Sequence, residues 1–168
     1  MVRWVPFGLV SLVWLVLIGR RLRQRRFWRA GWWLGCWALS ALTWTPVALS
    51  FGSAMQLGQL PTHWWANGVW VVRPFAPGDL DASFWLNIVM TVPQGALLAI
   101  NWPQLRWSQW VYVGLAVGLT LESGQALGNA LVSLGRWVDI NDILTNGLGV
   151  VLGALAVTGY RHWRTRLG

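Results

Sequence analysis

Polar residues that could hold or transform a ligand recur at helical spacing between positions 139 and 153. Asp139, Asp142 and Asn146 stand at i, i+3 and i+7, and Gly149 and Gly153 continue the same line. Residues at these intervals share one face of a helix. The line starts with carboxylates and an amide and ends in glycines among apolar residues. A carboxylate that enters a membrane is costly, so this stripe should have a partner or a function.

Two other apolar segments also carry polar groups on one face. Asn87 lies near the start of residues 84–100, and Glu122 and Gln125 lie near the end of residues 107–127. Lipid tails cannot satisfy such groups, so the three segments should turn their polar faces toward one another. The sequence therefore predicts an outward-open polar pocket whose ligand-binding residues are Asn87, Glu122, Gln125, Arg136, Asp139, Asp142 and Asn146.

Composition places these segments in a membrane. The chain has 168 residues, of which 55% are hydrophobic and only 11% are charged, against roughly 25% charged in a soluble domain. Apolar runs recur along nearly the whole chain, which predicts an all-α, polytopic bundle of about five transmembrane helices in a single membrane domain, residues 1–168. The expected spans are residues 2–19, 27–51, 84–100, 107–127 and 139–160, the third of them interrupted by Pro93. Residues 52–81 are expected to form a loop in which residues 63–65 and 69–72 are apolar enough to dip into the membrane interface, and residues 128–137 are expected to be a second short connection.

Arginines set the orientation. The net charge of +8 comes from arginine alone, and most arginines lie in short clusters beside apolar segments. Because cytoplasmic loops are enriched in Arg and Lys, residues 20–29 and the basic tail 161–166 should be cytoplasmic and the amino terminus outside. The clusters report orientation, with some affinity for anionic lipid headgroups, so membrane lipids are expected partners and nucleic acid is not.

Glycine pairs should allow the helices to approach closely. Pairs four residues apart occur at 114/118, 124/128 and 149/153, and small residues at this spacing are typical of membrane helix interfaces. A purely structural interpretation also fits the polar residues, since Arg136 could pair with Asp139 or Glu122 only to hold helices together.

The same residues resemble a known family. Asn87 followed by Pro93 and Gly95, Glu122 followed by Gln125, and Arg136, Asp139, Asp142 and Asn146 in series are similar to three linked motifs of VanZ-like membrane proteins. The resemblance runs over residues 84–153. It implies a bacterial protein of the cytoplasmic membrane, in a family whose namesake is associated with low-level teicoplanin resistance.

Three functions remain open on this basis. In the first, the pocket engages a cell-envelope ligand, a lipid-linked glycan precursor or a lipoglycopeptide, with Arg136 binding a phosphate or carboxylate. In the second, Glu122 and Asp142 act as the acid and base of an intramembrane hydrolase or transferase on an envelope lipid. In the third, Glu122 is the proton site of a lipid transporter. No catalytic triad and no metal-ligand spacing occurs, so neither a cofactor nor a metal is expected.

Overall fold

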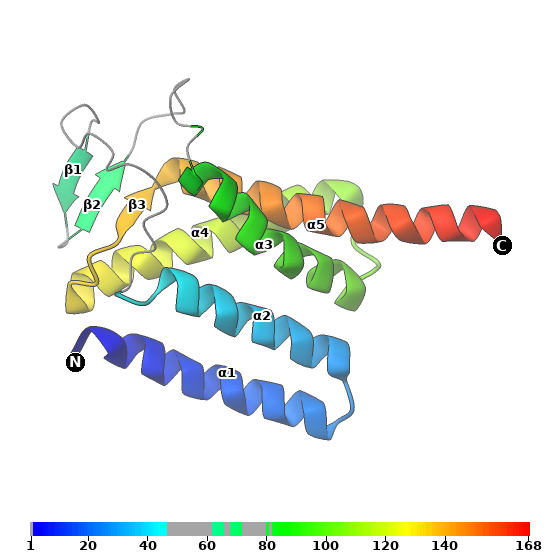
Figure 1. The fold of residues 1–168 in the computed structure, drawn as a ribbon, viewed down its shortest axis with the longest axis horizontal. Helices are drawn as coiled ribbons and strands as arrows, with labels where there is room; N and C mark the ends of the chain where they lie inside the picture. Colours follow the sequence, from blue (N-terminus) through cyan, green and yellow to red (C-terminus); the bar gives the residue numbers. More distant parts are fainter. Residues whose placement is uncertain (1, 47–61, 66–67, 72–79, 81) are drawn as a thin grey trace.

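The computed structural model describes residues 2–46, 62–65, 68–71, 80 and 82–168. In this part of the chain each helix runs antiparallel to the helix before it, so that successive helices cross the molecule in opposite directions (Figure 1). The first residues form a short 3-10 turn, η1. The helical elements are η1 (Val2–Trp4), α1 (Val5–Arg23), α2 (Phe27–Thr43), α3 (Ala82–Asn101), α4 (Trp107–Val132) and α5 (Ile140–Leu167).

This helical bundle is the predicted all-α architecture, and the chain is a membrane protein. Within the described residues, three helical segments are long and apolar enough to cross a membrane, Val2–Arg23, Ala82–Asn101 and Ile140–Leu167. The five predicted spans also need α2 and α4. Both are present as helices, α2 packing on α1 and α3 and α4 packing on α5.

Helix ends differ from the predicted spans for local reasons. The helix predicted over residues 27–51 ends at Thr43, two residues before the Thr45–Pro46 bond, because proline disfavours helical backbone in the residue before it. Residues 47–51 lie outside the described part. The last helix continues to Leu167 instead of ending at residue 160, since arginine and threonine do not break a helix.

Pro93 does not interrupt α3, contrary to the prediction. The helix is continuous from Ala82 to Asn101 with Pro93 inside it. Membrane helices tolerate proline because neighbouring groups can satisfy the backbone that it frees.

A small sheet replaces part of the predicted irregular connections. It comprises β1 (Thr62–Trp65), β2 (Gly68–Val71) and β3 (Trp137–Asp139) in that order, with β1 and β2 antiparallel and β2 and β3 parallel. These segments are rich in aromatic and β-branched residues, which favour strands. The short connection predicted at 128–137 is present but shorter than predicted, because α4 extends to Val132 and β3 begins at Trp137.

Helices α3, α4 and α5 pack through glycine. A side chain at Gly149 or Gly153 would collide with the backbone of α3, and one at Gly114 or Gly118 would collide with the backbone of α5. Two of the three predicted glycine pairs therefore lie at helix–helix contacts. The pair at 124/128 does not, because Gly124 faces the indole of Trp44 and Gly128 faces the side chain of Leu134.

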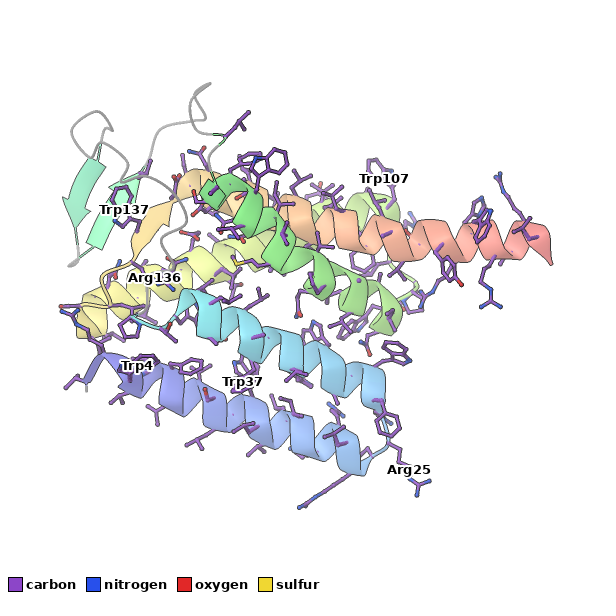
Figure 2. All side chains as sticks on the ribbon, viewed as in Figure 1. Trp4, Arg25, Trp37, Trp107, Arg136 and Trp137 are labelled. Atoms are coloured by element: carbon purple, nitrogen blue, oxygen red, sulfur yellow. The ribbon has the colours of Figure 1, made fainter. Side chains whose placement is uncertain are left out.

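The two ends of the bundle differ in chemistry. Arg25 lies at the α1–α2 turn, and Arg136 lies at the opposite end, beside the sheet (Figure 2). We call the end with β1–β3 the sheet end and the end with the α1–α2 turn the basic end. The sheet end carries the three described carboxylate side chains, Glu122, Asp139 and Asp142.

Candidate functional site

A cavity of about 320 Å³ opens at the sheet end, which we call the upper cavity. Helices α2, α3, α4 and α5, the connection before β3 and the first residue of β3 form its walls, so the prediction of a pocket between the last three helices omitted α2 and the strand. Four of the seven candidate residues line it, Asn87, Gln125, Arg136 and Asp142. The other lining residues are Leu42, Thr43, Ser83, Leu86, Met90, Gly135 and Trp137.

Arg136 joins the α4–β3 connection to the end of α2. Its Nε donates to the carbonyl oxygen of Thr45 at 3.0 Å, and a terminal N–H donates to that of Leu42. These carbonyls belong to the C-terminal end of α2, where cations are favoured. Partial burial lowers the pKa of the guanidinium, against the opposing effect of the Glu122 carboxylate, and arginine remains charged at neutral pH.

Asn129 fixes the backbone of Arg136. Its Nδ2 donates to the Arg136 carbonyl at 2.7 Å, and its Oδ1 accepts from the Arg136 amide at 3.0 Å. Asn129 is fully buried, so this pair of bonds holds the turn that presents Arg136 to the cavity.

Glu122 lies behind the upper cavity and does not line it. The side chain is 2% exposed. One carboxylate oxygen accepts from Gln125 Nε2 at 3.1 Å, and the other accepts from the backbone amide of Asp139 at 3.1 Å. Both oxygens are therefore used to orient Gln125 and to join α4 to the start of α5.

Asp139 caps α5 instead of belonging to it. Its backbone is extended, and its Oδ1 accepts from the amide of Asn141 at 2.8 Å. This is the geometry of an N-cap, which satisfies a free amide of the first turn. The predicted stripe therefore begins at Asp142, in the first helical turn, where a negative side chain is favoured by the helix dipole.

Asn146 is buried one turn below Asp142 and does not line the upper cavity. It is 1% exposed, and its backbone carbonyl lies 2.9 Å from the hydroxyl of Thr91 on α3. Its side-chain amide has no hydrogen-bond partner in the described structure. Position 146 thus lies at the α3–α5 contact, beneath the site.

Sequence reasoning missed the contribution of α2 and of Trp137. Leu42 and Thr43 line the upper cavity, yet residues 27–51 resemble any hydrophobic helix. Asn129 carried a detectable signal, because an asparagine near the end of an apolar helix needs partners.

The upper cavity combines a cation, a carboxylate, two amides and an indole. Such a set can donate and accept hydrogen bonds around a polar group and pack against an apolar face. These features define a membrane helical bundle with a polar chamber at one end. A sequence model of the family described as VanZ/LLP1 matches residues 7–161, and the chain belongs to this VanZ-like family. No curated protein and no solved structure matches the chain.

Proposed function

We propose that the upper cavity binds a cell-envelope ligand at the outer face of the bacterial cytoplasmic membrane. The ligand class is a lipid-linked glycan precursor or a lipoglycopeptide, and its capture gives low-level protection against teicoplanin-type glycopeptides. The observation that carries the proposal is the convergence of Asn87, Gln125, Arg136 and Asp142, from separate parts of the chain, on one cavity.

The charge distribution supports the outward orientation. Arginines occupy the turn at residues 20–29 and the end of α5, whereas the described carboxylates lie at the sheet end. By the positive-inside rule, the basic end faces the cytoplasm and the upper cavity faces outward. That is the side on which envelope precursors and glycopeptides meet the membrane.

Resistance of an expressing strain tests the proposal. Expression of the wild-type chain in a susceptible Gram-positive host is expected to raise the inhibitory concentration of teicoplanin. Arg136→Ala removes a guanidinium from the cavity wall, and Glu122→Gln replaces one of two acceptor oxygens with a donor, which displaces Gln125. Both variants should lose the protection while reaching the membrane at wild-type abundance.

Arg3→Ala is the matched control, since Arg3 is exposed and lies outside the cavity. It should protect like the wild type. Full protection by both Arg136→Ala and Glu122→Gln would overturn the proposal, and so would a wild-type chain that reaches the membrane and gives no protection.

An intramembrane acid/base enzyme is the second candidate. Asp142 lines the cavity, which favours it as a group that touches a substrate, whereas Glu122 is enclosed behind Gln125. Native mass spectrometry of the purified protein with retained envelope lipids separates the two candidates. Intact ligand in stoichiometric amount supports binding, and its conversion, lost in Asp142→Asn, supports the enzyme.

A proton-coupled lipid transporter is the third candidate and has the least support. The space below the upper cavity is lined mainly by apolar side chains. Transport of protons needs a chain of polar groups across the membrane, and the described walls do not supply one.

A further inference from the structure

A second cavity lies deeper in the bundle, which we call the lower cavity. It measures about 380 Å³. Its walls are almost entirely apolar and aromatic and come from α1, α2, α3 and α4. The residues that line it are Trp14, Trp32, Trp33, Cys36, Leu39, Ser40, Trp44, Gln94, Leu98, Val113, Ala116, Val117, Thr120 and Leu121.

The lower cavity lies mainly on the basic-end side of the upper one. On α2, Leu39 lines the lower cavity and Thr43 the upper one. The same relation holds for Gln94 and Met90 on α3 and for Leu121 and Gln125 on α4.

Each of these pairs is four residues apart, one turn along the same helix face. In each, the residue of the upper cavity lies nearer the sheet end. Three helices therefore place most of the lower cavity on the basic-end side of the upper one.

Trp44 lines the lower cavity although it lies nearer the sheet end than Thr43, which lines the upper one, so the two cavities adjoin at this point of α2. Its Nε1 donates to the carbonyl oxygen of Leu121 at 3.1 Å, and its ring fills the space that a side chain at Gly124 would need. Apart from this contact, α2 packs chiefly on α1 and α3. The lower cavity also reaches the surface of the bundle, because Ala116 and Thr120 line it and are exposed on α4.

Charge at the upper cavity is balanced. Arg136 and Asp142 are the charged side chains among its described lining residues, and their opposite charges offset each other. An anion would gain from Arg136 and be opposed by Asp142. An uncharged, hydroxyl-rich group can instead donate to Asp142, accept from Arg136 and the amides, and pack on Trp137.

We propose that the adjoining cavities bind one neutral glycolipid, with its sugar in the upper cavity and its hydrocarbon chain in the lower one. The chain enters from the membrane between α2 and α4, past Ala116 and Thr120. This assignment rests on the proposed function for the place of the ligand, and it goes beyond that function by specifying an uncharged glycolipid instead of a phosphate-linked precursor.

Photo-crosslinking tests the path of the chain. The probe is dodecyl glucoside with a diazirine at the end of its alkyl chain, added to the full chain in phospholipid nanodiscs. Crosslinks should be saturable, fall on lower-cavity residues such as Val113 and Val117, and be displaced by unlabelled dodecyl glucoside. Glucose or dodecanol at the same concentration should displace them far less, because each makes only part of the contacts and therefore binds more weakly.

A filled lower cavity provides the second test. Ala116→Trp places an indole in the lower cavity, and overpacking of this size should reduce the crosslinking by about tenfold or more. Leu119→Trp is the control, since Leu119 is exposed on α4 and does not line the cavity. It should retain wild-type crosslinking, and circular dichroism should show both variants folded.

The outcomes separate the two proposals. The proposed path of the hydrocarbon chain is overturned if the crosslinks spread over the lipid-facing residues of α1 and α5, or if Ala116→Trp does not reduce them. In either case, teicoplanin protection by the wild type would still support the proposed function. Displacement by dodecyl phosphate but not by dodecyl glucoside overturns the neutral sugar. If the wild-type chain gives neither saturable crosslinks nor teicoplanin protection, the glycolipid assignment and the proposed function are both overturned.

Discussion

Single residues at the sheet end divide into those that face the cavity and those that hold them in place. The cavity is lined by Asp142, Gln125, Asn87 and Arg136. Both carboxylate oxygens of Glu122, in contrast, accept hydrogen bonds from protein donors. A buried, paired carboxylate is costly to leave unpartnered. Any influence of Glu122 on the cavity therefore passes through the position of Gln125.

Asn129 provides the residue-scale prediction. Asn129→Leu removes two hydrogen bonds to the backbone of Arg136 and leaves a partly buried amide and carbonyl without these partners, which should cost about 1–3 kcal/mol. The midpoint of thermal unfolding in detergent should fall, and teicoplanin protection should weaken. Ser123→Ala is the control because Ser123 is exposed on the same helix, and a variant at 129 as stable as this control would contradict the interpretation.

Helix α5 is the element on which the arrangement depends. Its glycines let α3 and α4 approach its backbone on two sides, and this close approach brings Asn87 and Gln125 near Asp142. Packing in membranes depends on such contact, because apolar burial between helices gains little over contact with lipid.

The element-scale prediction compares two glycines of α5. A Cβ at Gly153 would overlap the carbonyl oxygen of Val92, whereas a Cβ at Gly159 meets nothing within 4 Å. Gly153→Ala should destabilise the bundle by about 1–3 kcal/mol through overpacking. Gly159→Ala should be neutral or stabilising, since alanine favours helix more than glycine does.

Thermal unfolding of the two purified variants in one detergent measures the difference. Equal midpoints would show that α3 and α5 do not pack as closely as described.

The whole molecule is polarised from end to end. Arginines gather at the basic end and carboxylates at the sheet end, so the chain carries its own orientation signal. The proposed ligand depends on this polarity, because the upper cavity must face the envelope.

Single-cysteine labelling tests the orientation. Cys36 is the one cysteine of the chain, so Cys36→Ser gives a background for Ser133→Cys at the sheet end and Gln24→Cys at the basic end. A membrane-impermeant maleimide should label the cysteine at 133 in intact bacterial protoplasts. It should label the one at 24 only after the membrane is permeabilised. The reverse pattern would place the upper cavity in the cytoplasm.

By itself, the sequence determined the helical class, the family, the polar stripe and the opposition of charged ends. The helical class, the stripe and the charged ends follow from composition and periodicity, and the family follows from the resemblance of three linked motifs; all of these are local features of the chain. Only the tertiary structure decided that α2 completes the cavity, that Asp139 is a cap and that Glu122 is enclosed. The physical reason is that the sequence of an apolar helix does not indicate which helix it will pack against. In the same way, a carboxylate in the sequence does not indicate which donor it will bind. Contacts such as Arg136 to the end of α2, far away in the chain, exist only once the helices have packed.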